Sequence, residues 1–522
     1  MNADDTGPPP AQAEVAEGPA LGAHETGAAQ LTGDGDILDA ASAGRLATRG
    51  GALRVGSYLG GALAGLGAAA LLYRHLGVIE VGRYGLILAL VAIVAAFSDL
   101  GLTAVGIRSA STETPAGRSA MLRDLLGLRL ALTVAGIGAI ALACLAIYPS
   151  IVALGVLIGG VALLLQECLD NYQISLVVDL RMGWVAAIGL AGSVGAAVLT
   201  AALVFAGAHL LTFVAIAIPV AAAGAAAAAR LARDDRSLLP SFSLERWRAL
   251  FARSIVYSAA VAAGVLYFYS AIVITSLLAN GHQLGYFQLS FRVTTVLTGI
   301  PGLLAISAFP IFSRAARDDL GRLGYALGRV FEVSLLVGAW VALSLAVGAR
   351  FAVELVGGSA STHNFLPAAP VLSFQAVALG GTFMGSVASF GLLSLGLNRQ
   401  ILLLNVTGLV GAVALMCVLV PLDGAQGAAI GTMIGEVGAA AAGWVVLGTT
   451  HAELWPPLRV VPRIALATIV GAAPVLLTSW PVLTRVMLSS VLYGAIVLAT
   501  KAFPRELLDL LPARLAARWP GR

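Results

Sequence analysis

Charged residues are scarce in this chain of 522 residues. Only 11% are Asp, Glu, Lys or Arg, and lysine occurs once, at Lys501. Because soluble domains carry about 25% charged residues, the composition excludes a soluble protein of this size. Hydrophobic residues reach 59%, and a membrane-spanning helix needs about 20 of them in a row. We therefore predict an all-α, polytopic membrane protein with about 14 transmembrane helices.

Residue patterns typical of disulfide frameworks, metal sites and nucleotide binding are also lacking. The three cysteines, Cys144, Cys168 and Cys417, lie inside apolar runs, which argues against a disulfide framework or a metal site. There is no phosphate-binding P-loop and no cluster of His and Cys. We expect neither a cofactor nor an enzyme, because loops on the predicted outer side, the longest near 357–365, are too short to assemble a catalytic set.

The apolar runs define the organisation of the chain. They lie at about 52–73, 84–107, 125–147, 151–176, 184–206, 209–230, 254–278, 285–312, 330–356, 366–394, 400–420, 425–449, 462–480 and 483–502. The predicted parts are a disordered acidic cytoplasmic tail (1–44), a six-helix bundle (45–231), a cytoplasmic linker (232–253), a second six-helix bundle (254–450), two extra transmembrane helices (451–502) and a basic cytoplasmic tail (503–522). The first tail has eight acidic residues, no Lys or Arg and no aromatic residue, so it cannot bury enough surface to fold.

The positions of the arginines predict an orientation. Cytoplasmic loops retain Lys and Arg, and with the N-terminus inside, nearly all 31 basic residues fall on the cytoplasmic side. The exceptions are Arg74, Arg83, Arg350 and Arg485 on the outer side, and Arg292 within a span. We therefore expect both termini in the cytoplasm. The inner basic loops favour contact with anionic membrane lipids, and nothing favours nucleic acid as a partner.

Four short motifs carry a resemblance to a known family. They are the turn LGVIEVGRYG at 76–85, the sequence FSDLGL at 97–102, the FP and SR pairs within 309–314, and the sequence DGAQGAA at 423–429, followed by Glu436. In this order and spacing they resemble the oligosaccharide (O-antigen type) flippases of the multidrug/oligosaccharidyl-lipid/polysaccharide exporter superfamily. The similarity runs from about residue 45 to 447.

The resemblance implies two six-helix bundles with pseudo-two-fold symmetry around a central cavity, and alternating access. It implies a polyprenyl-pyrophosphate-linked oligosaccharide as cargo, moved across the bacterial inner membrane, with a polysaccharide polymerase and glycosyltransferases as partners. The gradient that would drive transport, proton or sodium, stays open. So do three other functions: a lipid II flippase, a cation-coupled drug exporter, and a membrane glycosyltransferase or O-antigen polymerase, which the short outer loops disfavour.

Two ionisable residues lie deep within predicted spans, where a charge costs about 2.5–3.5 kcal/mol. Arg292 lies about 12 Å into its span, where its guanidinium would bind pyrophosphate oxygens or form an internal ion pair that docks helices. Glu436 lies near the midplane. It would pair with Arg292 in the empty state, carry a proton, or remain a neutral hydrogen-bonded group.

The fourth span is unusually polar. Glu167, Asp170 and Asn171 share one helical face, and this face is either a cavity wall that contacts cations or sugar hydroxyls, or a helix end near the head groups. Gln288 and Gln375 are candidates for sugar contacts. We predict structural or gating roles for Asp99, Arg108, Pro301 and Pro310: Asp99 would pair or anchor near Arg108, and the two prolines would kink the eighth span. We also predict an ordinary i, i+4 ion pair between Arg350 and Glu354.

Overall fold

A computed structural model describes residues 41–111, 114–179, 181–232, 239–358, 364–477, 480–500 and 502. Nearly all of these residues are helical, and none forms a strand. Of the predicted tails, 503–522 and all but the last residues of 1–44 lie outside the described residues, as does part of the linker, 233–238.

The first six predicted spans form the N bundle, with two of them broken into two helices. Its helices are α1 (Ala41–Leu76), α2 (Val78–Asp99), α3 (Leu102–Ala110), α4 (Pro115–Ile147), α5 (Ser150–Val178), α6 (Met182–Phe205), α7 (Leu210–Ala215) and α8 (Ala217–Leu231). The second span breaks between α2 and α3, where Leu100 and Gly101 both adopt left-handed backbone conformations with φ of 41° and 71°.

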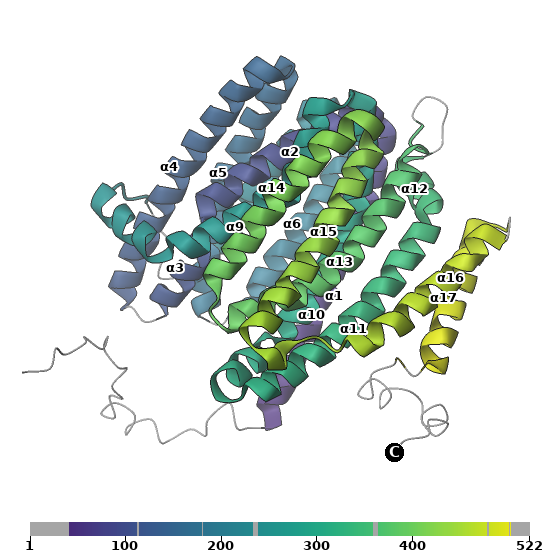
Figure 1. Ribbon diagram of the computed structural model, residues 1–522. Coiled ribbons are helices and arrows are strands. Elements are labelled where there is room, and N and C mark those ends of the chain that lie inside the picture. Colours follow the sequence, from purple (N-terminus) through teal and green to yellow (C-terminus); the bar gives the residue numbers. More distant parts are fainter. Residues whose placement is uncertain are drawn as a thin grey trace, which may run out of the picture. The chain divides into compact units, whose positions relative to one another are not determined.

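The next six predicted spans form the C bundle, and two helices follow it (Figure 1). The C bundle consists of α9 (Leu244–Leu278), α10 (Gly281–Asp318), α11 (Leu320–Val347), α12 (Ala349–Gly357), α13 (Ala368–Ser394), α14 (Asn398–Asp423) and α15 (Ala425–Thr450). Two short 3₁₀ turns, η1 (Ala452–Leu454) and η2 (Leu458–Val460), lead to α16 (Val461–Leu477) and α17 (Val482–Ala499), which pack against α11.

The helices confirm the predicted all-α membrane fold. Twelve helical spans among the described residues are long and apolar enough to cross a membrane, and α1 and the 17-residue α16 occupy the other two predicted spans. Four helices begin about ten residues earlier than predicted: α1 at Ala41, α4 at Pro115, α9 at Leu244 and α11 at Leu320. For α4 the reason is local: Thr114 caps the helix by accepting the Gly117 N–H (3.3 Å), and Pro115 occupies the first helical position.

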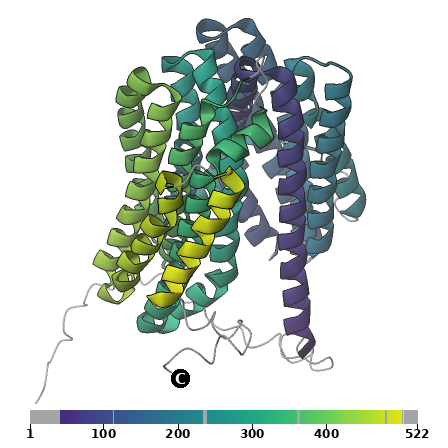
Figure 2. The ribbon, with the colours of Figure 1, turned by 90° about the vertical axis from the view of Figure 1, so that its right-hand side faces the viewer.

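The N and C bundles meet mainly where α2 packs against α9 and α10. Glycine allows the close approach of α2 to α10. A Cβ atom on Gly285 would lie 2.0 Å from the carbonyl oxygen of Val78, and one on Gly82 would lie 2.9 Å from the backbone nitrogen of Gly285. This contact holds the N-terminal ends of α2 and α10 together. Figure 2 shows the ribbon of both bundles from the side.

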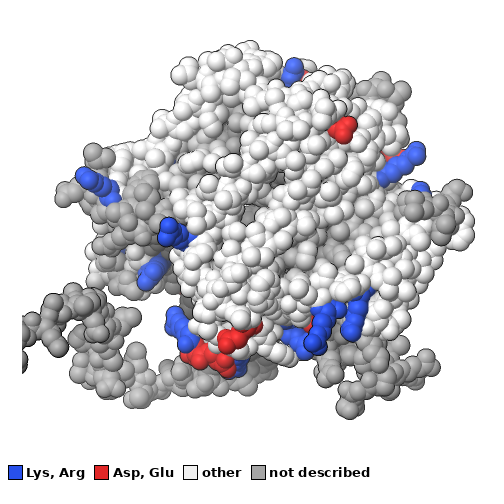
Figure 3. All heavy atoms as spheres, viewed as in Figure 1, with Lys and Arg blue, Asp and Glu red and all other residues white. Residues whose placement is uncertain are grey.

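The exterior of the described part is apolar over wide areas. Large hydrophobic side chains such as Phe205, Leu142 and Val198 are exposed by 85%, 71% and 62%. On the face in Figure 3, charged side chains lie around the rim and the middle carries none. This distribution suits a protein surrounded by lipid, in which side chains at membrane depth are apolar and charges lie near the head groups.

Candidate functional site

Arg292 lies on α10 and faces two adjoining cavities of about 450 and 300 Å³. Both are lined by α1, α6 and α10, and α2 adds to the smaller one; they share Gly61, Gly65, Ser193 and Arg292. We call them together the arginine cavity. The guanidinium reaches α1, where Nη2 donates to the carbonyl oxygen of Gly65 (3.4 Å). A Cβ on Gly65 would lie 3.1 Å from Nη2, so glycine leaves room for this group.

The arginine cavity contains a positive charge and no acid. None of its lining residues is Asp or Glu, and no described carboxylate forms an ion pair with Arg292. Its other polar groups are hydroxyls and one amide, from Tyr73, Tyr84, Ser193, Thr200, Thr295 and Gln288. The rest of the lining is Gly, Ala, Leu, Val and Met. A cation with free donors and surrounding hydroxyls can bind an anionic group.

Gln288, a predicted sugar-contacting residue, also lines this cavity. Its side chain is 6% exposed, and its Oε1 atom has no hydrogen-bond partner. Gln288 lies against α2, where a Cβ on Gly85 would come within 2.0 Å of its amide carbon. Gln288 is therefore held in place by packing while one amide atom stays available.

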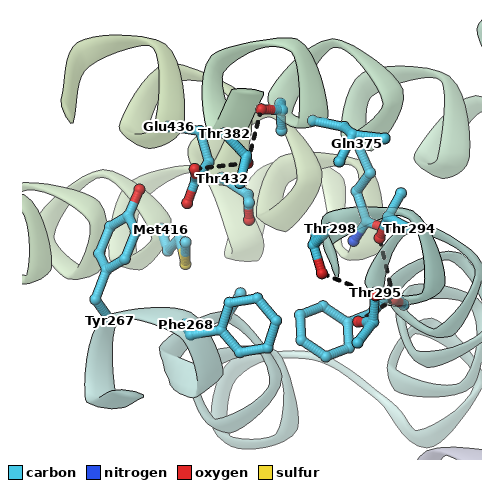
Figure 4. Close-up of a pocket in the computed structure, with 14 residues that line it drawn as sticks. Tyr267, Phe268, Thr294, Thr295, Thr298, Gln375, Thr382, Met416, Thr432 and Glu436 are labelled. Atoms are coloured by element: carbon cyan, nitrogen blue, oxygen red, sulfur yellow. Dashed lines mark hydrogen bonds between the residues drawn. The ribbon is translucent and has the colours of Figure 1, made fainter. Parts of the chain in front are cut away.

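Glu436 lies apart from Arg292, in a small cavity of about 50 Å³ within the C bundle (Figure 4). Its Oε2 accepts a hydrogen bond from Thr382 Oγ1 (2.8 Å), and Figure 4 shows the hydroxyl of Tyr267 on the same side. The predicted ion pair between Arg292 and Glu436 is therefore absent from this structure. Thr295, which lines both this cavity and the arginine cavity, lies on the helix that separates them.

Gln375 lies in the same small cavity as Glu436. Its Oε1 accepts a hydrogen bond from Thr294 Oγ1 (3.4 Å), and its Nε2 is buried without a partner. The two predicted glutamines thus line different cavities, Gln288 beside Arg292 and Gln375 beside Glu436. A shared sugar-contacting role stays a prediction.

The three polar residues predicted to share a face of the fourth span differ in their surroundings. Glu167 and Asn171 are buried, with 3% and 0% exposure, and Asn171 Nδ2 donates to the carbonyl oxygen of Leu122 on α4 (3.2 Å). Asp170 lines a cavity of about 840 Å³ between α5, α6 and α8, and it accepts a hydrogen bond from Gln166 (2.8 Å).

Asp99 is an anchoring residue, but its partner differs from the one expected. Its carboxylate accepts hydrogen bonds from the backbone of Gly101 and Thr103 and from the Thr103 hydroxyl, and it forms an ion pair with Arg129. Arg108 is exposed in the last turn of α3 and forms no hydrogen bond or ion pair with Asp99. The arginine nearest in sequence was therefore the wrong partner, because α4 brings Arg129 closer in space.

The remaining predicted residues occupy ordinary positions. Pro301 and Pro310 both lie inside α10, where each lacks the N–H that would bond to the preceding turn. The i, i+4 pair of Arg350 and Glu354 is confirmed, with 3.0 Å between Nε and Oε1. Roles in gating for the two prolines and Arg108 stay predictions.

Sequence reasoning missed Arg129 and the aromatic lining of the arginine cavity. Arg129 was counted with the basic residues of the cytoplasmic side although it lies within the predicted third span (125–147), and a Thr-Pro pair at 114–115 already marked an earlier helix start. With that start, Arg129 lies about 21 Å into the helix. Tyr73 and Tyr84 flank a turn and gave no signal that they face Arg292.

Comparisons with known proteins give the family of this chain and proteins of similar fold. The sequence model of the family described as "Polysaccharide biosynthesis protein" matches residues 47–316. No curated protein matches the sequence. The fold is similar to that of the lipid II flippase MurJ in an inward closed conformation, with a TM-score of 0.70 and 13% identity over 87% of this chain and 99% of that one.

Two further solved structures are transporters. One is a multidrug resistance MATE family transporter of the MOP superfamily in an inward-facing conformation, with a TM-score of 0.58 and 17% identity over 77% of this chain and 98% of that one. The other is the MATE transporter VcmN of Vibrio cholerae, with a TM-score of 0.56 and 16% identity over 79% of this chain and 99% of that one. The fold is thus shared with these transporters and with MurJ, and because the family model covers more than half of the sequence, this chain belongs to the polysaccharide biosynthesis protein family.

Proposed function

We propose that this protein moves a polyprenyl-pyrophosphate-linked oligosaccharide across the bacterial inner membrane by alternating access, for assembly of O-antigen or another polysaccharide. One observation carries the proposal: Arg292 faces a cavity without an acidic partner. A guanidinium in that position attracts pyrophosphate oxygens, which it can bind in a bidentate manner. Hydroxyls around it suit the sugar, and the apolar exterior suits a prenyl tail that stays in lipid.

The charge of the cavity also bears on the alternatives. A drug exporter for cationic compounds needs a negative or neutral cavity, whereas the lining here contains Arg292 and no acid. A lipid II flippase is favoured by the similarity in fold to MurJ, and its cargo shares the prenyl pyrophosphate. Arg292 would bind the pyrophosphate of either cargo, so the two functions differ in the sugar that is carried. Membership of the polysaccharide biosynthesis family favours an oligosaccharide.

Orientation and energy supply belong to the same proposal. The distribution of arginines along the sequence supports cytoplasmic N- and C-termini. In this orientation the α2–α10 contact lies at the outer end of the bundles. A proton or sodium gradient would drive the cycle, and Glu436, half-buried and bonded to Thr382 with no basic partner among the described residues, is a candidate to respond to it. A polymerase and glycosyltransferases would act before and after transport.

The test uses purified full-length protein in vesicles that contain a fluorescent polyprenyl-pyrophosphate glycan. We expect the labelled lipid to cross the bilayer faster than in empty vesicles, and Arg292→Ala to abolish the increase. Arg350→Ala is the matched control, because Arg350 is exposed in a surface ion pair, and it should leave the rate unchanged. If wild-type protein does not accelerate crossing, the function is wrong; if Arg292→Ala remains fully active, the role of Arg292 is wrong.

A further inference from the structure

Arg129 is a charged group that the proposed transport mechanism does not use. It lies on α4 and is fully buried, with 0% exposure, where it faces α2 and α5. An isolated buried charge is costly, so such a group must be paired. Two carboxylates from different helices flank it, Asp99 at the end of α2 and Glu167 on α5.

The two carboxylates are not equivalent partners. Arg129 Nη2 forms a close contact with Asp99 and with the Thr103 hydroxyl. By contrast, Arg129 Nε lies 3.7 Å from Glu167 Oε2, too far for a hydrogen bond. Nε and Nη1 are buried and have no hydrogen-bond partner. The guanidinium is therefore bound to Asp99 and has unused donors, one of which faces Glu167.

The cluster contains more acid than base. The charged groups that face Glu167 are Asp99 from α2, Arg129 from α4 and Asp170 from one turn along α5 itself, and the other described helices that pack on α5 add none. Three carboxylates thus share one guanidinium. A metal ion placed there would be repelled by Arg129, whereas a proton removes negative charge and needs no coordination shell.

Of the three carboxyl groups, Glu167 is the one best placed to bind a proton. Asp99 is about one-third exposed and accepts hydrogen bonds from Gly101, Thr103 and Arg129, all of which stabilise its charged form. Asp170 accepts one from Gln166 and lines the 840 Å³ cavity. Glu167 is 3% exposed and has no close donor. Asp170, one turn away, gives a released proton a route to that cavity.

Asp99 also holds the turn through which the N bundle touches the C bundle. It caps α3 across Leu100 and Gly101, and Leu100 is the only described residue other than glycine with a positive φ. Such a conformation is unfavourable for a residue with a side chain and persists only where its surroundings hold it. The carbonyl oxygen of Leu100 accepts a hydrogen bond from Ser258 on α9.

We propose that Glu167 is a proton-binding site that controls this contact between the bundles. With the proton bound, Arg129 stays on Asp99, the turn keeps its shape, and Leu100 stays bonded to Ser258. When the proton leaves through the cavity beside Asp170, the Glu167 carboxylate attracts Arg129 away from Asp99 and the turn loosens. The inference rests on the proposed function only in assuming that the bundles move relative to each other.

Infrared difference spectroscopy after a pH change tests the proton site on the purified full-length protein, without cargo. We expect a pH-dependent carboxylic acid C=O band in wild type that Glu167→Gln removes. Glu332→Gln is the matched control, because Glu332 also pairs with an arginine, Arg329 (2.7 Å), but within one helix. It should leave that band intact. If Glu167→Gln does not change the pH-dependent bands, the proposal is wrong.

A second measurement follows the contact itself. Spin labels at Arg108→Cys and Arg248→Cys, both exposed, in a background without native cysteines should report an α3–α9 distance that shifts with pH. Glu167→Gln should hold the low-pH distance at every pH, and Asp99→Asn should hold the high-pH distance. A shift in Glu167→Gln equal to that of wild type, or a shift that follows sodium and not pH, would overturn the proposal. Neither outcome depends on whether a glycan is transported.

Discussion

Arg129 and Arg292 are both arginines inside helices that cross the apolar core, yet their surroundings are opposite. Arg129 is fully buried among packed helices and flanked by two carboxylates. Arg292 faces a cavity, donates only to a backbone carbonyl of α1, and has no described acidic partner. The sequence alone gives the two residues the same chemistry, and the packing around them separates their roles.

The difference shows how to interpret an intramembrane charge. A charge that its neighbours neutralise contributes to the fold, and removing it leaves the neighbours exposed to an apolar interior. A charge that faces a cavity without a counter-ion is available to a ligand, and removing it costs the fold little. Stability should therefore respond to changes at Arg129, and cargo binding should respond to changes at Arg292.

The largest expected effect is on stability at Arg129. Arg129→Ala should lower the free energy of unfolding by about 3–5 kcal/mol, because it leaves the buried Glu167 and the partly exposed Asp99 without a cation. Arg292→Ala should change it by less than about 1 kcal/mol. Denaturant unfolding of the purified proteins in detergent, followed by tryptophan fluorescence, measures both. Equal losses in the two variants would show that the comparison is wrong.

A smaller effect is expected where the bundles close above the arginine cavity. Gly285→Ala places a Cβ 2.0 Å from the carbonyl oxygen of Val78, and the resulting overpacking should cost about 1–3 kcal/mol. Gly302→Ala is the matched control on the same helix, because a Cβ there meets nothing within 4 Å, and it should be neutral or slightly stabilising.

The free energies of unfolding of Gly285→Ala and Gly302→Ala are measured under the same conditions as that of Arg129→Ala and compared with each other. In Gly285→Ala the N-terminal ends of α2 and α10 should also move apart, which a pair of labels on these helices would detect. If Gly285→Ala is as stable as Gly302→Ala, the close α2–α10 contact does not form in the protein.

Much of the fold could be predicted because its cause is local. Runs of apolar residues between arginine-bearing loops determine where helices cross a membrane, and each predicted span coincides with a helix or a broken pair. The start of α4 was misplaced because Arg118 and Arg123 resemble a basic loop. The helix continues through them, since Arg118 pairs with Asp179 (3.0 Å), Arg123 bonds to Leu239 O (3.0 Å) and Arg129 pairs with Asp99.

The candidate site was predictable only in part. The depth of a residue within a span can be counted along the sequence, and this count identified Arg292 and Glu436 as ionisable residues inside the membrane. Which residues face each other depends on helix rotation and packing, which the sequence does not display. For this reason an ion pair with Arg292 was one of three interpretations left open for Glu436, whereas the structure gives Thr382 as the partner of Glu436 and places Tyr73 beside Arg292 in the cavity.

The most direct test of the central claim compares how the purified protein binds two lipids, a polyprenyl pyrophosphate and the corresponding monophosphate. If Arg292 binds the pyrophosphate, wild type should prefer it by about tenfold or more, since one charge-assisted hydrogen bond contributes about 1.5–3 kcal/mol. Arg292→Ala should bind the two lipids equally, and Arg350→Ala should keep the wild-type preference. An undiminished preference in Arg292→Ala would contradict the account.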